Sequence, residues 1–131
     1  MTVKDDTTVF AVDDDESVRL ALKRLIRSAG LKVETFASAR EFLNAGCARR
    51  TGILVLDVRM PEMTGLELQK QLARSGAEIP VIFISAHEDS QAVELALAAG
   101  AVAFLYKPFD DQDLLTAIDR ALDQTANDGA D

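Results

Sequence analysis

The chain alternates short apolar runs with segments of helical periodicity, and this alternation limits its possible folds more than any other feature. Residues 9–12, 53–56 and 81–84 are continuous apolar runs, as expected for strands buried on both faces of a parallel sheet. Residues 31–36 alternate apolar and polar side chains and predict a shorter, more exposed strand. Residues 103–106 predict the last strand.

Helical segments fill the intervals between these strands. The predicted helices are residues 17–29, a second helix opened by the capping box at residues 38–41, residues 66–73, residues 90–99, and a last helix capped by Asp110. Strands that alternate with helices form a parallel sheet covered on both sides. Five such units predict an α/β fold, a flavodoxin-like (βα)5 three-layer sandwich with strand order 2-1-3-4-5.

The alternating pattern also predicts where the domain begins and ends. We expect one domain over residues 9–122, a polar N-terminal extension over residues 1–8, and an acidic tail or the start of a linker over residues 123–131.

Composition excludes several classes of protein. The net charge of −8 and the single arginine pair, Arg49 and Arg50, argue against direct nucleic-acid binding by this domain, which would need a basic face. The chain has no signal-peptide pattern and no apolar stretch near the roughly 18 residues that span a bilayer. We therefore expect a cytoplasmic protein with no membrane partner. The lone cysteine, Cys47, can form no intramolecular disulfide and is a poor nucleophile candidate.

Three carboxylates follow two of the predicted strands. Asp13 and Asp14 come directly after the first strand, and Asp57 comes directly after the third. Ligands of open parallel sheets bind beyond the carboxyl ends of the strands, where the strand order reverses, so these acids should meet in one crevice. Unit charges about 4 Å apart repel by roughly 4 kcal/mol at an effective dielectric near 20. Either one carboxyl is protonated, with a raised pKa, or a cation such as Mg²⁺ lies among them.

The next two strand ends supply a hydroxyl and an ammonium group. Ser85 follows the fourth strand and Lys107 follows the fifth. A carboxylate nucleophile, a divalent cation, a hydroxyl and a lysine are the components that phosphoryl transfer needs, because that reaction depends on positioning and on neutralising spread negative charge.

These residues, taken together, resemble the receiver domains of two-component response regulators over residues 9–122. The matching positions are Asp13, Asp14, Asp57, Met60, Pro61, Gly65, Ser85, Lys107 and Pro108. The sequence is most similar to receivers that precede a LuxR-type helix-turn-helix.

The resemblance implies a role for each acid. Asp57 would accept a phosphoryl group. Asp14, Asp57 and the backbone carbonyl of Arg59 would ligate Mg²⁺, for which Mn²⁺ can substitute, and Asp13 would act through a metal-bound water.

The resemblance also implies how the bound phosphoryl group is sensed. Lys107 would pair with its oxygens, and Ser85 would donate a hydrogen bond to one of them. Ser85 and Phe104 would act as the switch residues, Arg59 and His87 would tune hydrolysis, and the Lys107–Pro108 peptide bond would be cis.

The implied partner is a sensor histidine kinase or a phosphotransfer protein, and the implied signal is a change in the face made by the fourth helix, the last strand and the last helix. The domain would be a phosphoacceptor that promotes its own phosphorylation and dephosphorylation, not an enzyme. Homodimerisation on phosphorylation and transcription regulation through a DNA-binding domain outside this chain are the implied outputs.

Other functions remain open at this stage. An aspartyl phosphatase would need a second acid and a cap over the substrate, and neither is evident. A flavin or nucleotide protein would need a phosphate-binding loop, and no G-x-x-x-x-G-K-[ST] or G-x-G-x-x-G motif occurs. A pseudo-receiver that only binds a partner would not need the complete set of acceptor residues.

Overall fold

The apolar runs form the strands of one parallel sheet in the computed structural model, which describes residues 7–46, 52–86 and 90–129. The strand order is β2-β1-β3-β4-β5, and every neighbouring pair is parallel. The strands are β1 (Thr8–Val12), β2 (Lys32–Phe36), β3 (Gly52–Asp57), β4 (Val81–Ser85) and β5 (Ala103–Tyr106). The predicted flavodoxin-like order is therefore confirmed.

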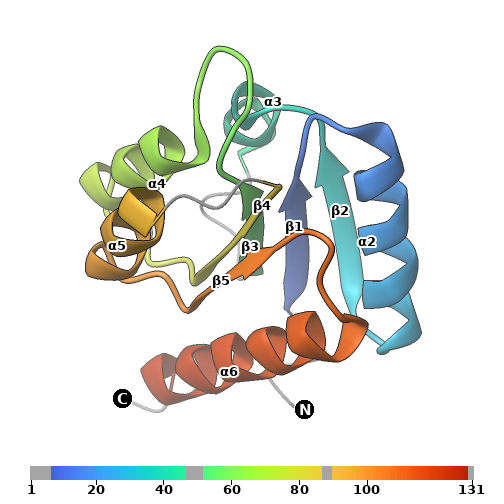
Figure 1. Cartoon of the computed structure of the whole chain (residues 1–131). Helices are drawn as coiled ribbons and strands as arrows, with labels where there is room; N and C mark the ends of the chain where they lie inside the picture. The colour runs from blue at the N-terminus through green and yellow to red at the C-terminus, as the bar shows by residue number, and fades with distance from the viewer. Residues whose placement is uncertain (1–6, 47–51, 87–89, 130–131) are drawn as a thin grey trace.

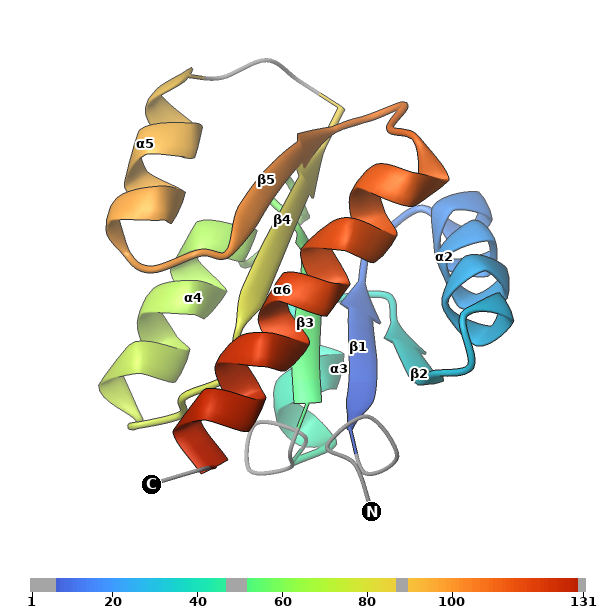
Figure 2. The same ribbon diagram turned by 90° about the horizontal axis from the view of Figure 1, so that it is seen from below.

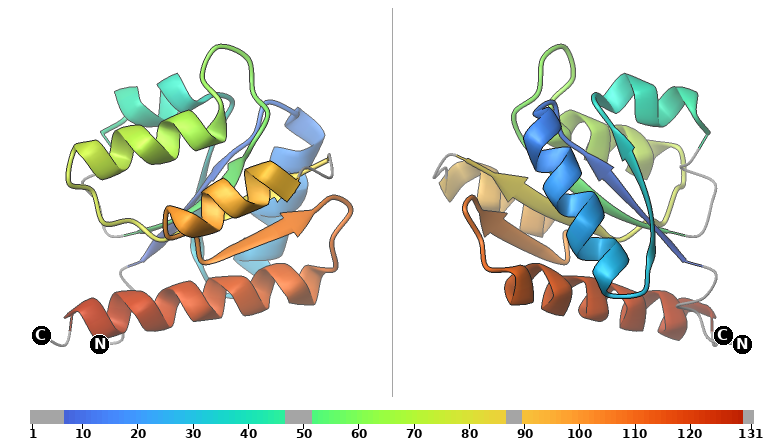
Figure 3. Two further views of the ribbon diagram at one scale, coloured as in Figure 1. Left: turned by 60° about the vertical axis from the view of Figure 1, so that its left-hand side comes forward. Right: turned by 90° about the vertical axis from the view of Figure 1, so that its right-hand side faces the viewer.

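Helices cover both faces of this sheet. They are α2 (Glu16–Ser28), α3 (Ala39–Asn44), α4 (Gly65–Arg74), α5 (Ser90–Ala98) and α6 (Asp111–Gly129). Figure 1 shows the labelled elements, and Figure 3 shows α3 and α4 together on one side of the molecule. Figure 2 shows α6, in red, running across the strands. The result is the three-layer sandwich that the sequence predicts.

Alternation along each strand divides the core between the two faces. In β1, Phe10 and Val12 pack with residues of α3, α4 and α5. Val9 and Ala11 of the same strand pack with residues of α2 and α6. Because successive side chains of a strand point to opposite faces, one continuous apolar run contributes to both halves of the core.

Side-chain caps start three of the helices. Asp15 accepts a hydrogen bond from the Ser17 N–H at the start of α2, and Ser38 accepts one from the Glu41 N–H at the start of α3. The reciprocal capping box lies at α4, between Thr64 and Glu67. Its T-x-x-E signal is present in the sequence but did not enter the sequence-based prediction.

Several element boundaries shift by one residue from the prediction, and two differences change the extent of the domain. Strand β1 begins at Thr8, and both Thr7 and Thr8 are buried, because the pairing with β2 and β3 extends to that residue. Helix α6 continues to Gly129, well into the predicted tail. Residues 123–128 contain neither glycine nor proline, so nothing in them interrupts a helix.

None of the helices in the described ranges is both long enough and apolar enough to cross a membrane.

Candidate phosphoacceptor site

The ends of β1 and β3 bring the three predicted acids together. Asp13, Asp14 and Asp57 each offer a carboxylate oxygen, and these oxygens lie within 4.8 Å of one another. Asp13 and Asp57 are buried, whereas Asp14 is exposed. Adjacent carboxylate oxygens on a rigid sheet edge suit a hard divalent cation such as Mg²⁺. The convergence predicted from the strand order is therefore present.

Asp13 is held on both of its carboxylate oxygens. The Asp15 N–H donates to Oδ1 at 2.9 Å, and the Lys107 ammonium donates to Oδ2 at 2.6 Å. Its own backbone N–H donates to the carbonyl of Phe36 at 3.1 Å. These contacts satisfy a carboxylate that has no exposed surface, as a buried charge requires.

Asp14 and Asp57 are held more loosely. Within the described ranges, no side-chain hydrogen bond or ion pair holds Asp14, which faces solvent. Asp57 accepts a long hydrogen bond, 3.4 Å, from the Arg59 N–H, and its Oδ2 lies 3.7 Å from the Lys107 Nζ. Both carboxylates therefore keep oxygens available for a ligand.

Burial changes the acidity of Asp57. Desolvation, followed by repulsion from Asp13, raises the pKa of Asp57 to about 6, although the Lys107 charge acts in the opposite direction. This carboxyl is 5% exposed, and the charged form of a buried acid is disfavoured. A cation among the acids would restore the ionised form that a nucleophile needs.

Lys107 contacts two of the acids, and Ser85 follows the residue of β4 that pairs with Asp57. The Lys107 Nζ is shared between Asp13 and Asp57, and it lies closer to Asp13. The Lys107 N–H donates to the Ser85 carbonyl at 2.7 Å, so the ends of β4 and β5 are tied together. Ser85 is buried at the end of β4. The Lys107–Pro108 peptide bond is cis, as expected.

Gly65 allows the loop after Asp57 to return against the strand. A Cβ at this position would lie 2.4 Å from the Asp57 carbonyl oxygen, which is too close for any side chain. The Gly65 N–H donates to the Val58 carbonyl at 2.9 Å. Within this loop Arg59 is exposed. The sequence alone identified Gly65 only as a position that matches the receiver family, and this close approach gives a physical reason for a glycine there.

Phe104 lies on the side of the sheet that α5 covers. Its ring stacks on Phe83 with centroids 5.9 Å apart, and it lies 5.5 Å from the ring of Tyr106. Tyr106 is 39% exposed, so the three rings connect the core to the surface. The sequence-based prediction did not include Tyr106. His87, predicted to tune hydrolysis, lies outside the described residues, as do Cys47, Arg49 and Arg50.

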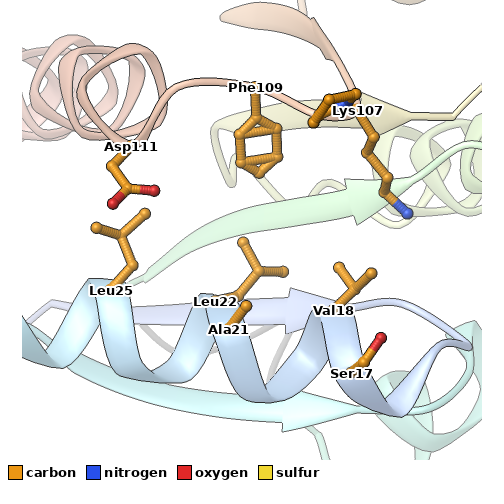
Figure 4. Close-up of a pocket in the computed structure, with 9 residues that line it drawn as sticks. Ser17, Val18, Ala21, Leu22, Leu25, Lys107, Phe109 and Asp111 are labelled. Atoms are coloured by element: carbon orange, nitrogen blue, oxygen red, sulfur yellow. The ribbon is translucent and has the colours of Figure 1, made fainter.

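An apolar hollow opens beside the acidic cluster. It has a volume of about 460 Å³ and lies between α2 and the segment that joins β5 to α6. Figure 4 shows Val18, Leu22 and Leu25 of α2 opposite Phe109, with the Lys107 side chain at one end. Since Lys107 also contacts Asp13 and Asp57, the hollow and the acidic cluster share a wall.

Comparisons with known proteins agree with this geometry. The family described as the response regulator receiver domain matches residues 9–119 of the chain. The chain is 50% identical to the response regulator protein TmoT of Ectopseudomonas mendocina over 117 residues, which cover 89% of this chain and 53% of that protein. It is 42% identical to the transcriptional regulatory protein FixJ of Azorhizobium caulinodans over 121 residues, which cover 92% of this chain and 57% of that protein.

A solved structure gives the same result. The response regulator StyR superposes with a TM-score of 0.89 at 49% identity, covering 95% of this chain and 63% of that one. The chain thus spans about half the length of the two curated relatives and somewhat more of StyR. Taken with the fold and the acidic cluster, these matches show that the chain belongs to the receiver domain family of two-component response regulators.

Proposed function

We propose that Asp57 accepts a phosphoryl group from the phosphohistidine of a sensor histidine kinase or a phosphotransfer protein, in a reaction that depends on a divalent cation. An Asp57 carboxylate oxygen attacks the phosphorus, the bond from phosphorus to the imidazole nitrogen breaks, and that nitrogen keeps the electron pair. The observation that carries the proposal is the cluster of Asp13, Asp14 and Asp57 around the Lys107 ammonium.

The described residues suit a metal site. Asp14, Asp57 and the backbone carbonyl of Arg59 would hold Mg²⁺ or Mn²⁺, and Asp13 would reach the metal through a water. When bound, the cation neutralises charge that develops on the phosphoryl oxygens. The free carboxylate of Asp14 supports a direct role, and the two occupied oxygens of Asp13 support an indirect one.

Lys107 and Ser85 would bind the transferred group. Phosphorylation adds about −1.5 to −2 charges and three acceptor oxygens. Lys107, 3.7 Å from Asp57, would move from Asp13 toward these oxygens, and the Ser85 hydroxyl would donate to one of them. Arg59 and His87 would tune the rate at which the group is hydrolysed.

The signal would pass through Phe104. Movement of Ser85 toward the phosphoryl group would let Phe104 rotate, and the surface made by α5, β5 and α6 would change shape. The contact of Phe104 with both Phe83 and Tyr106 supports this route, because a rotation must disturb both neighbours. The shift between two packings is limited by how differently the phosphoryl group interacts with each. Homodimerisation through the altered surface is the consequence we propose.

The donor protein would dock over the apolar hollow beside α2. The hollow shares Lys107 with the acidic cluster, so a protein seated there could present a phosphohistidine to Asp57. Apolar side chains from both walls, including Leu22 and Phe109, favour a protein surface as the occupant.

At the level of the whole protein, we propose a cytoplasmic regulator whose receiver domain comprises residues 9–122 together with Thr8 of β1 and the continuation of α6 to Gly129, preceded by a polar N-terminal extension and followed by a linker. Its output would be transcription, through a LuxR-type DNA-binding domain outside this chain. The name of FixJ as a transcriptional regulatory protein supports this output. The domain would act as a phosphoacceptor and not as an enzyme with a small-molecule substrate.

Intact mass after incubation with acetyl phosphate tests the proposal. One added phosphoryl group, seen with Mg²⁺ but not with a chelator, and seen in wild type but not in Asp57→Asn, is the expected result. Repeated turnover of a phosphomonoester would indicate an aspartyl phosphatase instead. No adduct from acetyl phosphate or from a phosphorylated kinase would indicate a pseudo-receiver.

A further inference from the structure

Arg19 reaches back from α2 to the loop that carries Asp13 and Asp14. Its Nη1 donates a hydrogen bond of 2.8 Å to the backbone carbonyl of Asp13. The Arg19 N–H bonds to the Asp15 carbonyl at 3.0 Å, so the residue is fixed in the first turns of the helix while its side chain returns to the preceding loop. Within the described ranges, no ion pair joins Arg19 to a carboxylate. The Arg19 side chain bonds instead to a backbone carbonyl.

This hydrogen bond restrains the peptide unit between Asp13 and Asp14. A peptide unit is planar, so holding its carbonyl oxygen also restrains its N–H and the Cα of Asp14. The side chain of Asp14 is exposed, and no residue in the described part of the chain bonds to it and orients it. On the other side of the loop, Asp15 is fixed by the Ser17 N–H at 2.9 Å. The direction of the Asp14 carboxylate therefore depends on its backbone.

We propose that Arg19 is a positioning residue that aims the Asp14 carboxylate at the divalent cation beside Asp57. The inference rests on the proposed function, since it concerns the metal site of that reaction. A guanidinium-to-carbonyl bond is charge-assisted and stronger than a neutral one. The rigid geometry of arginine suits such a fixed contact better than a flexible ammonium does.

A role as a mere positive charge would have the opposite consequence. Removing a cation near three carboxylates strengthens their attraction for Mg²⁺, because less repulsion opposes the incoming ion. Removing a positioning contact weakens Mg²⁺ binding, because Asp14 must be ordered when the ion arrives. The sign of the change in affinity therefore separates the two roles.

The experiment is an Mg²⁺ titration of the full chain, followed by the amide NMR shifts of Asp14 and Asp57, for wild type, Arg19→Gln and Arg19→Lys. The control is Arg24→Gln, which removes the same charge from an exposed position on the same helix. We expect Arg19→Gln to weaken Mg²⁺ binding on the order of tenfold, as for other residues that orient a ligand. Arg19→Lys should weaken it by a smaller factor, and Arg24→Gln should stay close to wild type.

An affinity of Arg19→Gln for Mg²⁺ that equals or exceeds that of wild type would overturn the proposal. If that variant does not fold, a wild-type affinity for Mg²⁺ in Arg19→Lys would overturn it. Amide hydrogen exchange without metal at Asp15, whose N–H donates to Asp13 Oδ1, provides a second readout. It should be faster in the Arg19 variants than in Arg24→Gln, and equal exchange would contradict the positioning role. If wild type itself shows no Mg²⁺-dependent shift, the metal site of the proposed function fails instead.

Discussion

The two faces of the sheet are built from different side chains. The buried residues on the side of α2 and α6 are aliphatic, with Val9, Ile26 and Ile118 among them. The side of α3, α4 and α5 buries Phe10, Phe42 and Phe83 and packs Phe104 against them. Branched aliphatic side chains have few rotamers and interlock. Aromatic rings pack through their faces and edges, and the side that holds them is the side on which we propose the signal to travel.

The helices that pack against β5 differ in the size of the side chains that they bury. The buried residues of α5 are Ala92 and Ala96, whereas α6 buries Leu114 and Ile118, together with two alanines. Burying apolar surface stabilises the folded chain by about 25 cal/mol per Å², and alanine side chains bury little of it. Helix α5 is therefore held less strongly than α6. The buried Gln69 side chain donates to the Ala96 carbonyl at 3.2 Å and ties the C-terminal end of α5 to α4.

The largest effect should come from the aliphatic side. Ile118→Ala removes a side chain with no exposed surface and should lower the free energy of unfolding by about 2–4 kcal/mol, because a cavity remains. Leu95→Ala on α5, where the leucine is 50% exposed, should change it by less than about 0.5 kcal/mol. Denaturant unfolding of both variants measures the difference. Equal losses would contradict the contrast between the two helices.

The next effect concerns Asp57, at the edge that both faces share. Its pKa of about 6 in the folded chain lies above the ordinary value of 3.8, so without metal the folded state binds more protons between these values and loses stability as pH rises through them. Asp57→Asn should therefore be more stable than wild type by about 1–2 kcal/mol at neutral pH, and the gain should vanish below about pH 4.

Denaturation in the presence of a chelator, at neutral and at acidic pH, measures this gain. Asp110→Asn, which removes an exposed acid outside the cluster, is the control and should show no such gain. By the same reasoning, Mg²⁺ binding should weaken as pH falls through about 6, because protonated Asp57 is a poor ligand. A gain in Asp57→Asn that is independent of pH would contradict the raised pKa.

A third prediction concerns the surface on which the phosphoryl donor protein docks. Ala21→Arg places a charged side chain in the hollow beside α2 and should slow phosphoryl transfer from a kinase on the order of tenfold, equivalent to about 1.4 kcal/mol. Phosphorylation by acetyl phosphate should stay unchanged, because a small donor does not need the hollow. The measurement is the rate of phosphorylation of wild type and variant with each of the two donors. Equal slowing of both would place the damage in the acidic cluster.

The smallest effect should come from the ring stack. Phe104→Leu removes two aromatic contacts and should cost about 0.5–1.5 kcal/mol of stability, with phosphoryl uptake retained. Tyr106 is the single tyrosine in a chain without tryptophan, so its fluorescence reports directly on this stack. Beryllofluoride with Mg²⁺ should change that fluorescence in wild type and change it less in Phe104→Leu. An unaltered response in the variant would show that Phe104 does not carry the signal.

The element order, the strand order and the meeting of the strand-end residues could all be predicted from the sequence. The spacing of apolar residues and the residues that begin or end a helix are local properties of the sequence. A parallel sheet then brings the carboxyl end of every strand to one edge. Asp57, Ser85 and Lys107 were found in this way. The end of α6 at Gly129 was missed, because polar residues permit a helix as readily as a tail.

What the tertiary structure alone decided is which of two chemically identical neighbours is buried and which is exposed. Asp13 and Asp14 are adjacent residues of one type, yet Asp13 is buried between Lys107 and the Asp15 N–H, whereas Asp14 faces solvent. The sequence by itself determined that an acidic cluster would form and on which fold. The burial of one acid and the exposure of the other, and the contact of Arg19 with the loop that carries them, depend on which partners lie within hydrogen-bond distance in three dimensions, because burial makes an unpartnered charge too costly.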